Sequence, residues 1–115
     1  MRIIDENNKI TIAEVRKMAK KMFDNLVKAV VDVEKEIMVV DGELHSDEEE
    51  ILIEKGSKYE NLWGINIYPE KKDEDWLEFD SLINLKPNLG NRTRGVKDVK
   101  IKEKIIKIVK KLVKK

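Results

Sequence analysis

The chain has 115 residues, enough for one domain and too few for two, so we expect residues 1–115 to form a single domain. Charged and hydrophobic residues each make up 41% of the sequence, which excludes a disordered chain, and no apolar run is long enough to span a membrane. A formal net charge of +1 excludes a polycation that coats nucleic acid, and the lack of cysteine excludes disulfides and thiolate metal sites. The polar N-terminus has no signal-peptide core, which favours a cytoplasmic protein.

The first third of the chain predicts a helix followed by a strand. Thr11-Ile12-Ala13-Glu14 is a capping box, in which threonine and glutamate side chains each bond the other residue's backbone amide. Apolar residues then recur at helical spacing, so we expect a helix from about Ile12 to Asn25. From Val27 to Val40 the pattern changes to alternating β-branched residues, which predicts one long strand, broken or bulged near Lys35.

A short helix and a β-hairpin are expected next. A second capping box begins at Ser46 and predicts a helix from Asp47 to Lys55. Leu62–Tyr68 and Trp76–Leu85 have the pattern of strands, and the charged connection between them is short enough for an antiparallel hairpin.

The last part of the sequence predicts a loop and a helix. Residues 86–97 contain a proline and two glycines and show no periodicity. Asp98 can cap a final helix with an apolar stripe among lysines, a pattern that suits packing on the core and also membrane-surface or nucleic-acid binding. The order helix, strand, helix, strand, strand, helix predicts an α+β fold, with a small antiparallel or mixed sheet and helices packed on one face.

The expected strands place oxygen-bearing side chains on the sheet face away from the helices. They are Asp32, Glu34, Glu36, Asn66, Glu78, Asp80 and Asn84. In the simplest hairpin register Asn66 faces Glu78, and Gly64 leaves a gap beside Asp80 through which a ligand can approach the backbone. An antiparallel sheet with one solvated face predicts the same alternation without any ligand.

The acidic residues on this face also form a candidate metal site. Alternate strand residues lie roughly 6.5–7 Å apart, so two carboxylates can converge on one hard cation. Asp32, Glu34 and Asp80 are the candidate ligands for Mg²⁺ or Mn²⁺. In a metal-dependent phosphoesterase or nuclease, Glu34 and His45 would be the candidates for proton transfer. The alternative for His45 is a structural role beside the Ser46 cap.

The stretch Pro-Asn-Leu-Gly-Asn-Arg-Thr-Arg-Gly at 87–95 is the candidate anion-binding loop. Glycine lets backbone amides turn toward one point, and arginine adds forked donors that suit phosphate or carboxylate. The candidate ligand-binding residues are Gly90, Asn91, Arg92, Arg94, Asn66 and Asn84. The alternative is that both arginines pair with the acidic sheet face and fasten the loop.

The favoured interpretation is a small binding domain that engages an anionic ligand through Arg92 and Arg94. That ligand would be a nucleotide, a nucleic-acid segment or an acidic partner protein, and Tyr68 and Trp76 can either stack a base or pair with each other. The alternatives are the metal-dependent phosphoesterase or nuclease, and a structural or regulatory homo-oligomer. Whether the protein is an enzyme stays open.

Four sequence strings carry a resemblance to a known family. They are Val31–Met38, Gly42–His45, Trp63–Asn66 and Gly90–Val96. Across about residues 10–112 the chain resembles a family of small prokaryotic proteins catalogued as a domain of unknown function. The resemblance implies a stand-alone domain and brings with it no activity, cofactor or catalytic residue.

Overall fold

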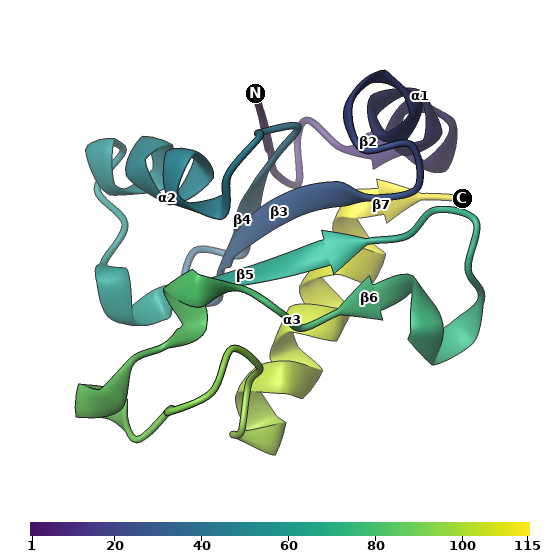
Figure 1. The fold of residues 1–115 in the computed structure, drawn as a ribbon. Helices are drawn as coiled ribbons and strands as arrows, with labels where there is room; N and C mark the ends of the chain where they lie inside the picture. Colours follow the sequence, from purple (N-terminus) through teal and green to yellow (C-terminus); the bar gives the residue numbers. More distant parts are fainter.

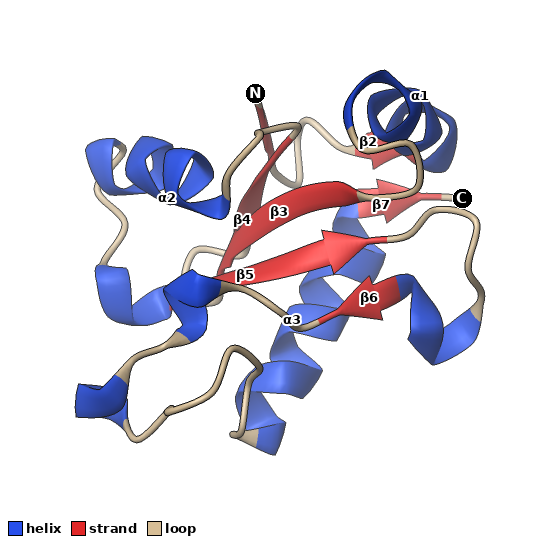
Figure 2. Ribbon diagram, viewed as in Figure 1, coloured by secondary structure: helices blue, strands red, loops and turns tan.

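The computed structural model describes residues 1–115, which form a five-stranded antiparallel sheet with three α-helices (Figure 1). The sheet has the order β1-β4-β3-β5-β6, and its strands are β1 (Arg2–Ile4), β3 (Val27–Asp32), β4 (Ile37–Val40), β5 (Leu62–Ile67) and β6 (Leu77–Glu78). The helices are α1 (Ile12–Met22), α2 (His45–Glu54) and α3 (Val99–Leu112). A separate parallel pair joins β2 (Ile10–Thr11) to β7 (Val113–Lys114), as Figure 2 shows. None of the helices combines the length and the apolar character that crossing a membrane requires.

Two of the three predicted helix starts are confirmed. The Thr11 hydroxyl accepts the Glu14 amide at 3.1 Å, and the Glu14 carboxylate accepts the Thr11 amide at 3.1 Å, as expected for a capping box. At the start of α3 the Asp98 carboxylate accepts two amides of the first turn. α1 ends at Met22, earlier than predicted, because Asp24 has a left-handed φ of 74° that a helix cannot continue.

The start of α2 differs from the prediction. The helix begins at His45, with Leu44 at the N-cap position, so Ser46 lies inside the first turn and cannot act as the expected cap. No side chain accepts a hydrogen bond from this helix end. The backbone amides of His45 and Ser46 therefore have no partner within the helix.

The strand predicted over residues 27–40 is interrupted near Lys35, where a break or bulge was expected. Its single direction is wrong, because these residues form the two antiparallel strands β3 and β4. Oδ1 of Asp32 accepts the amides of Glu34 and Lys35, both at 2.9 Å, and this closes a tight turn. Glu36 has a left-handed φ of 57° on the same turn. Glu34 and Glu36 consequently lie at the turn rather than on the sheet face.

The helices cover both faces of the sheet. Ala29 and Val31 of β3 belong to a large apolar cluster with α1 and α3, whereas Val30 and Val39 pack against Leu52 of α2. Alternate strand residues point to opposite faces, so α2 lies across the sheet from α1 and α3 (Figure 1). The α+β class is confirmed, but the expectation that all helices share one face is wrong. We call the face under α2 the α2 face.

The hairpin of β5 and β6 has the predicted register, with Asn66 opposite Glu78. β6 ends at Glu78, however, so most of the strand expected over Trp76–Leu85 is absent. The Asn84 side chain takes the place of a neighbouring strand there: its Oδ1 accepts the Gly64 amide at 2.8 Å, and its Nδ2 donates to the Gly64 carbonyl at 3.0 Å. The exposed edge of β5 is thus completed by a side chain.

Candidate functional site

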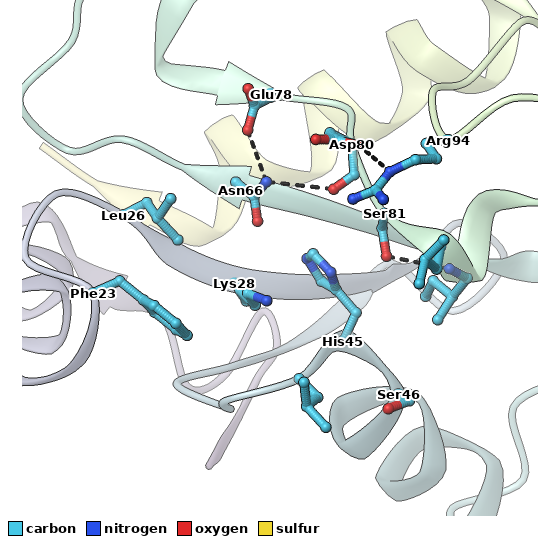
Figure 3. A pocket seen from close by; sticks show the side chains of 13 residues that line it. Phe23, Leu26, Lys28, His45, Ser46, Asn66, Glu78, Asp80, Ser81 and Arg94 are labelled. Atoms are coloured by element: carbon cyan, nitrogen blue, oxygen red, sulfur yellow. Dashed lines mark hydrogen bonds and ion pairs between the residues drawn. The ribbon is translucent and has the colours of Figure 1, made fainter.

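A pocket of about 520 Å³ lies on the α2 face, beyond the N-terminal end of α2 (Figure 3). Its charged and polar lining includes Lys28, His45, Asn66, Glu78, Asp80 and Arg94. Apolar side chains complete the wall, among them Phe23 after α1 and Leu82. We call this site the α2 pocket. It exists because α2 packs mainly on β3 and β4 and leaves the face of β5 and β6 open at its end.

Three side chains from neighbouring strands form a row on the pocket floor. The register places Lys28 opposite Asn66, and Asn66 opposite Glu78. Nδ2 of Asn66 donates to Oε1 of Glu78 at 2.8 Å and to the Asp80 carbonyl at 3.4 Å. Because both of these partners only accept, the orientation of the Asn66 amide is fixed.

The fixed orientation leaves Oδ1 of Asn66 without a partner. Asn66 is only 7% exposed, and its Oδ1 is buried and accepts no hydrogen bond. Figure 3 shows this oxygen directed toward the space between Lys28 and His45. A buried acceptor without a donor is unfavourable, so this atom marks a place where an occupant with an N–H or O–H group would be stabilised.

His45 lies over β5 at the edge of the pocket and is 8% exposed. Its Nε2 is 2.8 Å from the Ile65 carbonyl, which only accepts, so Nε2 carries the proton and Nδ1 of the neutral ring is an acceptor. Burial lowers the pKa of His45, which keeps the ring neutral at pH 7. A Cβ at Gly64 would lie 2.6 Å from Oγ of Ser81 and 3.2 Å from Cδ2 of His45, so these side chains fill the gap that the sequence suggested for a ligand.

Only one of the two loop arginines reaches the pocket. Nε of Arg94 donates to Oδ1 of Asp80 at 2.6 Å, and no other nitrogen of this guanidinium makes a hydrogen bond. Arg92 is exposed and makes neither a hydrogen bond nor an ion pair. The expected pairing of an arginine with the acidic sheet face is therefore present for Arg94 alone.

The other candidate residues of the loop hold its backbone. The buried Asn91 side chain donates to the carbonyls of Asn84, Thr93 and Gly95. Asn84 donates in turn to the Arg94 carbonyl at 2.9 Å. Gly90 ends a 3₁₀ turn with a left-handed φ of 80° and does not line the pocket. The loop thus places Arg94 beside β5, with its asparagine amides occupied by backbone.

The two charges at the ends of the floor row have no opposite charge beside them. Lys28 takes part in none of the five ion pairs of the structure, and its Nζ lies 5.1 Å from the centroid of the Phe23 ring. Glu78 accepts from neutral groups only, the Asn66 amide and the Tyr68 hydroxyl at 3.0 Å. The pocket therefore has a free ammonium group at one end and a free carboxylate at the other.

The structure does not bring the candidate metal ligands together. Asp32 is fully buried, and its Oδ2 accepts the Ser57 hydroxyl at 2.6 Å. Glu34 is exposed on the β3–β4 turn, and Asp80 is paired with Arg94. Nowhere do three histidine or acidic side chains gather in an arrangement that could hold a metal ion.

A family model described as "Protein of unknown function (DUF5674)" matches residues 2–112. The chain belongs to this family. The match spans all elements of the main sheet and every residue that lines the α2 pocket. No curated protein and no solved structure matches the chain. Because the family description names no activity, a function for this DUF5674 domain has to be argued from its own geometry.

A larger hollow of about 700 Å³ in the DUF5674 domain lies between the turn that precedes β6 and the outer side of α3. Two of the three lysines around it already lie over aromatic rings, with Nζ of Lys102 at 5.0 Å from the ring centroid of Phe79 and Nζ of Lys115 at 4.7 Å from that of Trp76. Trp76 is 4% exposed, so its ring is not open for a base to stack on. No buried, unpartnered polar atom faces this hollow, and the α2 pocket is the better candidate site.

The sequence pattern did not single out Lys28 as a site residue. It occupies an alternate position between Leu26 and Val30, where a strand that is covered by a helix would carry an apolar side chain. A single lysine within a run of mostly β-branched residues is thus the sequence feature that could have indicated a site at this position. Its meaning depends on the pairing with Asn66, which requires the strand order.

Proposed function

We propose that the α2 pocket of this protein binds a small molecule through an anionic group of that molecule. The observation that carries the proposal is the convergence of unpaired donors there. Lys28 has no carboxylate partner, Arg94 uses one of its three nitrogens, and the amides of His45 and Ser46 are uncapped. Helix N-termini favour anions because their free amides and the helix dipole both stabilise negative charge.

The size of the site supports a small molecule rather than a macromolecule. Pockets for small ligands usually enclose about 300–1,000 Å³ and combine apolar walls with a few polar groups. The α2 pocket encloses about 520 Å³ and has an apolar wall together with a few polar and charged side chains. A nucleic acid would need a row of cations along an extended surface, whereas this site has Lys28 and Arg94 with Glu78 and Asp80 between them.

The contacts of His45 support a binding role. Nε2 is already engaged by the Ile65 carbonyl, and neither Ser46 nor Ser81 forms a hydrogen bond with the ring. The Ser81 hydroxyl accepts the amide of Ile83 instead. No activated nucleophile is therefore held beside a base, which acyl or phosphoryl transfer through a serine would need.

Amide chemical shifts from NMR titration test the proposal directly. Inorganic phosphate and 4-methylpentanoate are the probes, and we expect shift changes centred on the amides of His45 and Ser46. Lys28→Met, which keeps most of the apolar stem, and Arg94→Ala should each weaken binding about tenfold, since each removes a charged donor.

Arg92→Ala is the matched control, because Arg92 is on the same loop, is exposed and makes no hydrogen bond or ion pair. It should leave the affinity unchanged. Equal loss of affinity in Arg92→Ala and Arg94→Ala would place binding on the loop surface rather than in the pocket. Dissociation constants weaker than about 10 mM for both probes, without shift changes at the α2 N-terminus, would refute the proposal.

A further inference from the structure

We infer that the ligand of the α2 pocket is a zwitterion of the amino-acid type, with its carboxylate at Lys28 and the α2 amides and its ammonium group at Asn66 and Glu78. This inference rests on the proposed function and adds a second charged group to the ligand. It names a substrate class, small molecules that carry an amine and a carboxylate.

The first step is the unpartnered oxygen of Asn66. Its amide nitrogen is held by Glu78 and by the Asp80 carbonyl, so the side chain cannot turn to hide Oδ1. A carboxylate that has no amine or hydroxyl group offers this atom only oxygen lone pairs, which repel it. A ligand that fits must present an N–H or O–H donor at this point of the floor.

The second step is the charge of the neighbouring carboxylate. Both hydrogen bonds to Glu78 come from neutral groups and both reach Oε1, so Oε2 is left without a donor from the protein. An ammonium group carries three donors and a positive charge. It can satisfy Oδ1 of Asn66 and pair with Glu78 at once, which a hydroxyl group cannot do.

The third step is the distance across the floor. Lys28 and Glu78 flank Asn66 on the two adjoining strands, so their backbones are about two strand spacings, roughly 10 Å, apart. Their long side chains can bend toward the middle and approach the two ends of one small molecule. The uncapped amides of α2 lie on the Lys28 and His45 side, where the carboxylate would be (Figure 3).

The net charge of the site agrees with this arrangement. Lys28 and Arg94 are balanced by Glu78 and Asp80, so the site favours a ligand of zero net charge over a dianion. His45 adds a neutral acceptor through Nδ1. Phe23 and Leu82 line the apolar wall, which suits an aliphatic side chain on the ligand.

The test compares three molecules that differ in one charge at a time. Leucine carries both charges, 4-methylpentanoate lacks the amine, and 3-methylbutylamine lacks the carboxylate. We expect leucine to bind at least about tenfold more tightly than either analogue in titration calorimetry. The set 5-aminopentanoate, pentanoate and butylamine makes the same comparison for a wider separation of charges.

Variants assign each charge to its residue. Glu78→Gln should abolish the advantage of the zwitterion over its deaminated analogue while keeping an acceptor for Asn66 and Tyr68. Lys28→Met should abolish the advantage over the decarboxylated analogue. Glu74→Gln, an exposed carboxylate outside the pocket, is the matched control and should change neither ratio.

The outcomes separate this inference from the proposed function. If the carboxylates bind in the pocket as tightly as their zwitterions, the inference is overturned and the anion-binding function stands. If the advantage of the zwitterion persists in Glu78→Gln, the ammonium group is not at Glu78 and the inference is also overturned. If neither set nor phosphate shifts the pocket amides, the proposed function itself fails.

Discussion

Glu48 of α2 has a fully buried side chain, so its carboxyl group lies in the interior of the molecule. Its Oε2 accepts the Gly42 amide at 2.9 Å, while its Oε1 is buried without a partner. Burial raises the pKa of Glu48 to about 9, so the folded protein holds this side chain in its neutral form at pH 7. The unfolded chain would ionise it near its ordinary pKa of 4.5.

This difference predicts how stability depends on pH. Between about pH 5 and 9 the unfolded state gives up a proton that the folded state keeps, so the free energy of unfolding falls as pH rises. Glu48→Gln removes that fall and still accepts the Gly42 amide. We expect a gain on the order of 1–3 kcal/mol at pH 7 and almost none at pH 4, measured by urea unfolding. Glu50 is exposed on the same helix, so Glu50→Gln should leave the pH dependence of the free energy of unfolding unchanged. An equal gain in stability for Glu48→Gln at pH 4 and pH 7 would contradict the prediction.

Single residues were predictable from the sequence where their role is local. Strand alternation was enough to place Asn66 opposite Glu78, because a short hairpin fixes its own register. Asp32 was assigned to an open polar face, yet it is buried against Ser57, 25 residues further along the chain. No periodicity signals such a contact, and the unpartnered oxygen of Asn66 was hidden for the same reason.

At the scale of elements, the Asn84 side chain makes the hydrogen bonds to β5 that a longer β6 would otherwise make. The Asn84 amide makes three bonds to backbone, to both polar groups of Gly64 and to the Arg94 carbonyl. It therefore links the edge of β5 to the loop that carries Arg94. We therefore expect this buried asparagine, together with Asn91, to support the loop and the position of Arg94 in the α2 pocket.

Asn84→Ala should break this link. The free energy of unfolding should fall by about 2–4 kcal/mol, because buried backbone groups lose their partners. Hydrogen exchange should speed up at the Gly64 amide and across residues 91–97. Asn88→Ala changes an exposed asparagine on the preceding 3₁₀ turn and should have little effect. Unchanged exchange at Gly64 in Asn84→Ala would show that the sheet edge does not need this side chain.

The predicted elements were right where a local sequence motif marks the start of a helix. They were wrong where a turn was interpreted as part of a strand. The capping box at Thr11 and the Asp98 cap marked two helices correctly. The reversal of the chain at the β3–β4 turn was missed because the charged residues 34–36 were interpreted as a break or bulge within one strand. Its real signal is Asp32, whose short side chain closes the turn on two following amides.

At the scale of the whole molecule, the placement of α2 decides where a site can form. α1 and α3 bury one face of the sheet, and α2 covers only part of the other. The α2 face changes from apolar under the helix to polar beyond its N-terminus, along the same strands. This arrangement follows from non-local packing, so composition and periodicity could predict the α+β class but not the side on which α2 lies.

The last strand, β7, pairs in parallel with β2, the segment just before α1, and Figure 1 shows this pair beside α1. Val113 of β7 is opposite Ile10, and both are buried in the large apolar cluster. β7 follows α3 directly, so this contact joins the last helix to the segment that starts α1. The sheet edges themselves are short, two and three residues in β6 and β1, which limits pairing with another chain.

Val113→Ala tests whether this closure supports the whole fold. Truncating a buried valine removes apolar contacts and leaves a cavity, so we expect a loss of about 1–3 kcal/mol in the free energy of unfolding. Val99→Ala at the exposed start of α3 is the matched control, and its effect should stay within about 0.5 kcal/mol. If β2 and β7 close the structure cooperatively, near- and far-ultraviolet circular dichroism of Val113→Ala will still melt together at a lower temperature. Separate transitions, with α1 lost first, would mean that the N-terminal helix depends on the pair while the sheet does not.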